Sequence, residues 1–324
     1  QGLMKLHIID DDLHYEPSIA HSVSNLVDYE VISSTEVYGL TSTSLSEIVL
    51  NEDGASISTA WVTGLSSAAG FVTTETNDDG YPDFAIVQNT NGVSSLALYE
   101  SSVSAETNAV SYAVTDTIDI TSINTNLVNA IGVELGDING DGFDDYIVGD
   151  AAGQTVALLG SDESVQPSTW SSVSTASSAE GSVTRSNFVV YDLNEDGSDE
   201  LVSTYRDGSV VKTSYQASDG DIPAILSDIE LVAAAEGAEL IHPALTSVIG
   251  DQVCYTSDTN QLSTLTVVGD EVSREVLVTF DKDEVIVASS TSADLDADNL
   301  SELLTPTSNG LVITLDNGDI IGAE

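Results

Sequence analysis

The stretch "GDINGDGFDDYIVGD", from Gly136 to Asp150, places four aspartates, one asparagine and two loop glycines directly before a short apolar run, and a fifth aspartate, Asp150, follows the run. Oxygen-bearing side chains alternate at Asp137, Asn139 and Asp141, and another follows at Asp145. Carboxylates this close together repel one another unless a cation or solvent screens them. Asp, Asn and Gly favour turns, and the apolar run is typical of a buried strand. The stretch therefore predicts an acidic turn that leads into a strand.

The same pattern recurs in phase along the chain. Glu75–Asp83, Asp192–Glu200 and Asp294–Glu302 repeat it, and each is followed at once by apolar residues. Gly39–Glu47 and Ala244–Gln252 align with it but lack the acids at loop positions 1, 3 and 5. The six starts, at residues 39, 75, 137, 192, 244 and 294, lie about 50 residues apart. The chain is therefore predicted to be an array of similar units.

A turn signal follows each start by about 16 residues, and apolar strand-like segments flank it. These signals are Gly54, Asn91-Gly92, Gly153, Asp207-Gly208, Asn260 and Asn309-Gly310. Short antiparallel strands in units of this length predict an all-β fold, a β-propeller of four-stranded blades, with a β-sandwich array as the alternative. We expect residues 1–324 to form one propeller domain of six or seven blades, a seventh being placed either in residues 1–38 or in the long interval after Glu75. Residues 1–38 would help to close the ring, with "MKLHII" pairing near "DIIGAE".

Calcium is the cation that suits the acidic loops, because it takes about six to eight hard oxygen ligands. Side chains at loop positions 1, 3, 5 and 9, with the backbone carbonyl of position 7, can surround one ion. Four such sites are predicted, and Ca²⁺ is the expected cofactor. Their ligands would be Glu75, Asn77, Asp79, Tyr81 and Asp83; Asp137, Asn139, Asp141, Phe143 and Asp145; Asp192, Asn194, Asp196, Ser198 and Glu200; and Asp294, Asp296, Asp298, Leu300 and Glu302.

An EF-hand or dockerin loop is excluded by the twelfth position. That loop needs a bidentate Glu there and helices on both sides. The residues at this position are Ile86, Val148, Ser203 and Thr305, all within predicted strands.

The segment "LGDINGDGFDDYIVGDAAG" resembles the FG-GAP repeat of the integrin α-subunit propeller and its bacterial relatives. Gly149-Asp150-Ala151 partly matches the Gly-Ala-Pro that follows the calcium loop in that family. The resemblance is specific at the third and fourth repeats and weaker at Glu75 and at Asn299, where the loop glycine is missing. It implies an extracellular module whose calcium loops stabilise the blades while another surface binds a ligand.

The charge balance limits the partners. The chain has 54 acidic residues against 6 Lys and Arg, for a formal net charge of −48. Nucleic acid and anionic membranes are bound through basic patches, so neither is an expected partner. No apolar run is long enough to span a membrane. Dispersed acid fits a protein kept soluble in marine or halophilic surroundings. The resemblance to FG-GAP repeats implies a secreted, cell-surface or periplasmic location, and the chain could be part of a larger surface polypeptide. Cys254 is the single cysteine of the sequence, so an internal disulfide cannot form, and we expect this residue to be a buried small hydrophobe.

No catalytic motif stands out. Asp12, His14, Glu16 and His21 match no standard zinc spacing. Trp61 and Trp170 could stack on sugars, but tryptophan at such positions is more often core. We therefore expect a non-catalytic recognition or adhesion module that binds a protein or glycan. The alternatives are a polysaccharide hydrolase or lyase, for which paired carboxylates in a central pocket would be the sign, and a surface-layer or spacer component.

Overall fold

The regular secondary structure of the described residues is almost entirely β-strand, which confirms the all-β prediction. The helix α1 (Ile120–Ile123) is a single turn, and no described helix is long and apolar enough to cross a membrane. The structure is a computed structural model that describes residues 5–9, 12–16, 26–33, 36–51, 54–77, 79–161, 171–174, 184–219, 224–232, 246–249, 252–258, 261–268, 271–280, 286, 291–293, 302–307, 310–314 and 320–322.

The chain divides into two compact units. The first comprises residues 1–5, 16–135 and 145–174, and the second comprises residues 6–15, 136–144 and 175–324. The boundary therefore separates the acidic loop at residues 136–144 from the strand that follows it.

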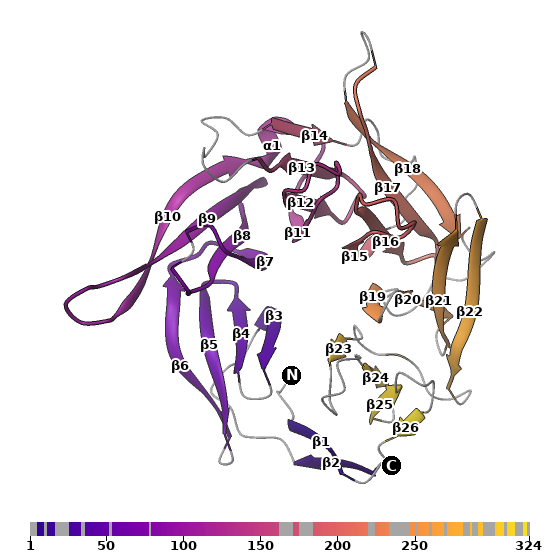
Figure 1. Cartoon of the computed structure of the whole chain (residues 1–324), viewed down its shortest axis with the longest axis horizontal. Coiled ribbons are helices and arrows are strands. Elements are labelled where there is room, and N and C mark those ends of the chain that lie inside the picture. Colours follow the sequence, from indigo (N-terminus) through magenta and orange to yellow (C-terminus); the bar gives the residue numbers. More distant parts are fainter. Residues whose placement is uncertain are drawn as a thin grey trace. The chain divides into compact units, whose positions relative to one another are not determined.

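The first unit holds three four-stranded sheets (Figure 1). Their strands are β3 (Leu26–Ser33), β4 (Glu36–Thr41), β5 (Ser44–Asn51) and β6 (Gly54–Thr63); β7 (Ala68–Thr74), β8 (Asp83–Thr90), β9 (Val93–Val103) and β10 (Val110–Asp119); and β11 (Ala130–Gly136), β12 (Asp145–Asp150), β13 (Thr155–Leu159) and β14 (Ser171–Ser174).

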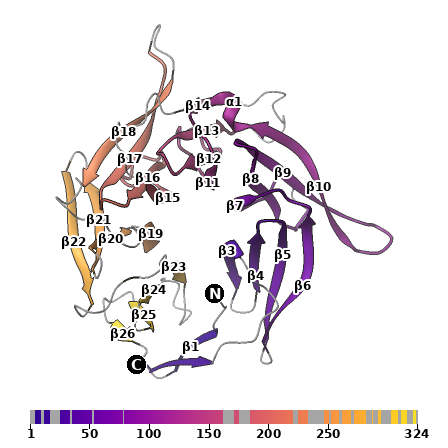
Figure 2. The same cartoon turned by 180° about the vertical axis from the view of Figure 1, so that it is seen from behind.

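The second unit holds three more four-stranded sheets (Figure 2). Their strands are β15 (Arg185–Tyr191), β16 (Glu200–Tyr205), β17 (Val210–Gln216) and β18 (Ile225–Val232); β19 (Thr246–Ile249), β20 (Gln252–Asp258), β21 (Gln261–Val268) and β22 (Glu271–Thr279); and β23 (Thr291–Ala293), β24 (Glu302–Thr307), β25 (Gly310–Thr314) and β26 (Ile320–Gly322).

Each four-stranded sheet consists of consecutive strands, and the pairs with a described register are antiparallel. This confirms the four-stranded units predicted from the repeat. β1 (Lys5–Ile9) and β2 (Asp12–Glu16) form a separate two-stranded sheet. Pairing of β1 with the last sheet is not among the described pairs, so closure of the ring by the N-terminal segment stays a prediction. The prediction that residues 1–324 form one propeller domain also stays a prediction.

The predicted hairpins lie where the turn signals occur. Asn91 and Gly92, with φ of 53° and 82°, join β8 to β9 and leave Thr90 opposite Val93. Both turn residues adopt the left-handed conformation that a tight two-residue hairpin requires. Gly208, with φ of 81°, lies in the equivalent turn between β16 and β17.

Alternate side chains of the second strand of a sheet pack against the two different sheets that lie on either side of it. In the first unit, Phe84 and Ile86 of β8 pack against the β3–β6 sheet, whereas Ala85 and Val87 pack against the β11–β14 sheet. In the second unit, β20 behaves in the same way. The strand period of two thus places apolar side chains on both faces, and within each unit the sheets stack face to face in chain order.

The first repeat is shifted relative to the prediction. Residues 39–47, predicted to be a loop, form the end of β4, a tight turn and the start of β5. The interval between the starts at residues 39 and 75 is shorter than the others, and this feature of the sequence could have revealed the error. In the fifth repeat, residues 246–249 likewise belong to β19 rather than to a loop.

The long interval after Glu75 holds no seventh blade, because the extended β9 and β10 hairpin and α1 fill it.

Candidate cation-binding loops

The fourth acidic loop folds around its own backbone. The Asp192 carboxylate accepts hydrogen bonds from the N–H groups of Asp196 (3.1 Å) and Gly197 (2.9 Å) through its two different oxygens. The Asn194 side-chain oxygen accepts a second contact from the Asp196 N–H at 3.0 Å, and the Asp196 carboxylate accepts from the Ser198 N–H at 2.9 Å. The side chains at positions 1, 3 and 5 therefore converge on the inside of the turn.

The third loop has the same network at the same positions. The Asp137 carboxylate accepts from the N–H groups of Asp141 (3.0 Å) and Gly142 (2.7 Å). The Asn139 oxygen accepts from Asp141 at 2.9 Å, and the Asp141 carboxylate accepts from Phe143 at 3.0 Å. Two segments far apart in sequence thus adopt one local conformation, which their shared spacing dictates.

Left-handed backbone at positions 4 and 6 makes this turn possible. Position 6 is Gly142 or Gly197, with φ of 89° and 87°. Position 4 is Gly140 in the third loop, with φ of 72°, but Glu195 in the fourth, with φ of 57°. A side chain at positive φ strains the backbone, so this loop conformation is energetically less favourable in the fourth loop than in the third.

Glu200, at position 9 of the fourth loop, already has a cationic partner. The Lys212 ammonium lies 3.2 Å from its carboxylate, and both side chains are largely buried. The Leu193 N–H (3.1 Å) and the Asn194 amide (2.9 Å) also donate to it. Burial raises the pKa of Glu200, and Lys212 opposes that effect. A calcium ion here would have to share Glu200 with the lysine, which sequence spacing did not predict.

The matching residue of the third loop, Asp145, opens β12 and is fully buried. Its Oδ1 accepts from the Gly160 N–H at 2.7 Å.

The second loop keeps only part of the network. Asn77 accepts from the Asp79 N–H at 3.1 Å, and Asp79 accepts from the Tyr81 N–H at 2.9 Å, as in the other loops. The Ser101 hydroxyl also donates to both Asp79 oxygens, at 3.0 and 3.1 Å. Glu75, at position 1, is exposed. The longer Glu side chain at this position does not reproduce the Asp contacts described for the third and fourth loops.

Asp83, at position 9 of the second loop, is buried between the loop and β9. It accepts from the Thr76 N–H at 2.8 Å, from the Thr76 hydroxyl, and from the Ser101 N–H at 2.7 Å. Asn77 donates to the Ser101 carbonyl at 3.0 Å. This loop is therefore anchored to its own sheet by Ser101.

The sixth loop lies outside the described residues. This applies to Asp294, Asp296, Asp298 and Leu300, and to the side chain of Glu302.

The third and fourth loops dock on each other through Asp199, at position 8. Its carboxylate accepts from the Asp137 N–H at 2.8 Å, while its own N–H donates to the Asp137 carbonyl at 2.8 Å. Gly136 and Gly140 allow this approach. A Cβ on Gly136 would lie 2.6 Å from the Asp199 carboxylate, and one on Gly140 would lie 2.5 Å from the Ser198 hydroxyl.

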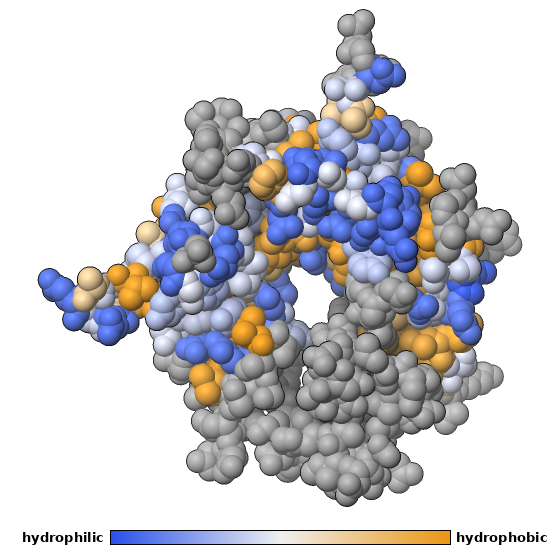
Figure 3. All heavy atoms as spheres, in the orientation of Figure 1, coloured by the Kyte–Doolittle hydropathy of each residue, from blue (hydrophilic) through white to orange (hydrophobic). Residues whose placement is uncertain are grey.

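Asp199 is a functional candidate that spacing did not identify. Burial raises its pKa, and the charges of Asp192, Asp137 and Asp144 act in the same direction. The only sequence signal is that both loops have an acid at position 8, Asp144 and Asp199. Figure 3 shows hydrophilic residues gathered over the region where Figure 1 places β15 and β16, the strands that flank the fourth loop.

A scan against protein-family models finds no match for this chain, and a search of curated proteins finds no relative. The resemblance to FG-GAP repeats therefore rests on the loop residues themselves and stays a prediction.

The chemical type of the donor atoms in these loops fits calcium. Asp192, Asn194 and Asp196 present hard oxygens, and a carboxylate that accepts one N–H per oxygen still has lone pairs for a cation. Among the described residues, no three acidic, His or Cys side chains are grouped closely enough to form a ready metal centre. Calcium would therefore have to draw these oxygens together.

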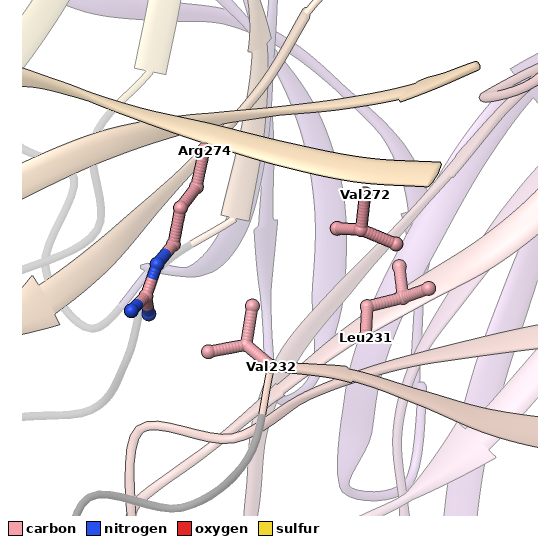
Figure 4. A pocket seen from close by; sticks show the side chains of 4 residues that line it. All are labelled: Leu231, Val232, Val272 and Arg274. Atoms are coloured by element: carbon pink, nitrogen blue, oxygen red, sulfur yellow. The ribbon is translucent and has the colours of Figure 1, made fainter. Parts of the chain in front are cut away.

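A shallow cavity of about 290 Å³ lies between β18 and β22 in the second unit. Figure 4 shows Leu231 and Val272 pointing toward each other, with Arg274 beside Val232. This lining has no carboxylate, so it is not the paired-carboxylate pocket that a glycosidase would need.

Trp61 and Cys254 both lie in packed environments. Trp61 stacks on Phe84 at 5.4 Å between ring centroids and also contacts Tyr38 and Tyr112, which supports the core interpretation. Cys254 is a free, buried thiol, as predicted, and burial raises its pKa to about 12. Trp170, His21 and the side chains of Asp12, His14 and Glu16 lie outside the described residues.

Proposed function

We propose that the chain is a calcium-stabilised β-propeller that serves outside the cell as a recognition or adhesion module without catalytic activity of its own. Six four-stranded antiparallel sheets, each of consecutive strands, support the propeller. So does the face-to-face stacking of sheets within each unit, which is how propeller blades pack.

One observation carries the calcium part of this proposal. The third and fourth loops share the same set of backbone-to-carboxylate hydrogen bonds and dock through Asp199. Asp137, Asn139, Asp141, the Phe143 carbonyl and Asp145 would hold one ion, and the equivalent residues of the fourth loop would hold another. When bound, calcium supplies positive charge that offsets the repulsion between the loop carboxylates, and its binding free energy then adds to folding stability.

Recognition at a surface agrees with the composition. A net charge of −48 disfavours nucleic acid and anionic membranes but leaves proteins and neutral glycans as partners. The resemblance of the loops to extracellular FG-GAP modules favours the same role.

Thermal unfolding with excess calcium and with chelator, combined with counting of bound metal, tests the calcium part. We expect the unfolding midpoint to fall by more than about 10 °C on chelation if several sites are lost. Asp192→Asn should reduce this difference. Asp207→Asn is the matched control, because Asp207 makes a similar turn contact to the Ser209 N–H (3.0 Å) outside the acidic loops. Equal midpoints with calcium and with chelator would contradict calcium stabilisation.

Glycan arrays and pull-downs with extracellular proteins test the recognition part. Specific binding without turnover supports it. Hydrolysis or elimination of a polysaccharide by the purified chain would overturn it in favour of an enzyme, and ordered polymerisation in calcium would favour a surface-layer component.

A further inference from the structure

Three acidic residues lie on the first strands of two sheets in the first unit, two on β3 and one on β11. Asp28 and Glu30 lie two residues apart on β3, so they share one face of that strand. Glu134 lies on β11, two residues after Gly132. These residues take no part in the acidic loops.

β7 lies against β3 through two hydrogen bonds to these acids. The Phe71 N–H donates to Asp28 at 3.0 Å, and the Thr73 hydroxyl donates to Glu30. The Tyr29 N–H also donates to Asp28, at 2.9 Å. Asp28 and Glu30 thus point toward β7, a strand that has no charged residue.

β11 approaches β7 closely at a pair of glycines. A Cβ on Gly70 would lie 2.8 Å from the Gly132 Cα and 3.5 Å from the Asp28 carboxylate. Only glycine permits such backbone proximity. The approach places Glu134 close enough for the charges of Asp28 and Glu30 to act on it.

Glu134 is influenced by two acids, and no described Lys, Arg or His side chain forms an ion pair with it. None of the described side chains donates a hydrogen bond to it, and Glu134 is the one charged residue of β11. Burial raises its pKa to about 8, and repulsion from Asp28 and Glu30 adds to the rise. Burial likewise raises the pKa of Asp28 to about 6, against the lowering effect of its backbone hydrogen bonds.

We propose that Glu134 keeps its proton at neutral pH beside Asp28 and Glu30, and that these three residues make the first unit a pH-sensitive element that is most stable in mild acid. When the proton is lost, three carboxylates repel one another across β3, β7 and β11, and the contacts between these strands weaken. This inference does not depend on calcium or on the proposed recognition role.

The direction of the pH dependence follows from the raised pKa of Glu134. Below its ordinary value of 4.5 the carboxyl is protonated in both folded and unfolded chains, so its stabilising effect is fully present. As the pH rises from 4.5 toward about 8, the folded chain keeps a proton that the unfolded chain loses, and this stability is progressively lost. One proton corresponds to about a tenfold rise in the unfolding equilibrium constant per pH unit in this range.

The test compares the wild type with Glu134→Gln, which keeps the side-chain shape and removes the titration. Glu106→Gln is the matched control, because Glu106 is an exposed acid in the same unit. Urea unfolding is followed by tryptophan fluorescence from pH 5 to pH 9 in the presence of chelator, since Trp61 lies in the first unit. We expect Glu134→Gln to be more stable than the wild type above pH 8 and to have a flatter pH profile, whereas Glu106→Gln should keep the wild-type slope.

Infrared spectroscopy provides a readout that does not depend on unfolding. At pH 7 the wild type should show the carbonyl band of a protonated carboxyl that is absent from Glu134→Gln. Identical pH slopes for the wild type and Glu134→Gln, or the absence of a protonated carboxyl at pH 7, would overturn the proposal.

Discussion

Replacing Asp199 tests whether the docking of the third and fourth loops stabilises the second unit. Asp199→Ala removes the acceptor of the Asp137 N–H but leaves the reciprocal backbone bond at 2.8 Å. A hydrogen bond to a charged group contributes about 1.5–3 kcal/mol, and partial solvent exposure of Asp199 reduces this to about 1–2 kcal/mol. Asp199→Asn keeps an acceptor and removes one charge from the group of Asp192, Asp137 and Asp144. The Asn variant should therefore lie within about 0.5 kcal/mol of the wild type or be more stable.

The assay is urea unfolding by circular dichroism in chelator, together with hydrogen exchange of the peptide that contains residues 137–145. We expect Asp199→Ala to lower the free energy of unfolding and to accelerate exchange in this peptide, while Asp199→Asn changes neither much. Exposed Glu106→Gln serves as the control for loss of one charge. If the Ala and Asn variants have the same free energy of unfolding and the same exchange, the Asp199 hydrogen bond is not a stabilising link.

Three further predictions concern individual positions. Glu195→Gly should raise the free energy of unfolding by about 0.5–1 kcal/mol, because glycine adopts its φ of 57° without strain; equal or lower stability in urea melts would contradict this. Gly136→Ala should lower the free energy of unfolding by about 1–3 kcal/mol, because its Cβ would lie 2.4 Å from a Val190 methyl carbon, and a neutral effect would show that the loop shifts freely. Cys254 should resist thiol reagents at pH 8 in the folded protein and react on unfolding, because burial raises its pKa to about 12; rapid labelling of the native chain would contradict the packing.

Much of the fold could be predicted from local patterns. The Asn91-Gly92 turn and the apolar residues around it were enough to place a hairpin, because the turn chemistry and the strand period act over a few residues. The first repeat was misplaced because residues 39–47 have no acid at loop positions 1, 3 and 5 to mark the phase, and a β-hairpin has the same turn-like composition. The function proposed from these patterns stays a prediction.

The sequence by itself determined the conformation of the third and fourth loops and the alternation of β8. In these loops each side-chain acceptor lies within five residues of its donor, so spacing alone defines the turn. Only the tertiary structure placed Asp199 against Asp137, 62 residues away, Asp28 against Phe71, 43 residues away, and Lys212 beside Glu200. Such pairs depend on which sheet faces bury each other and on where glycines let backbones approach. Packing over the whole unit decides which of these long-range pairs form, and no local sequence period predicts them.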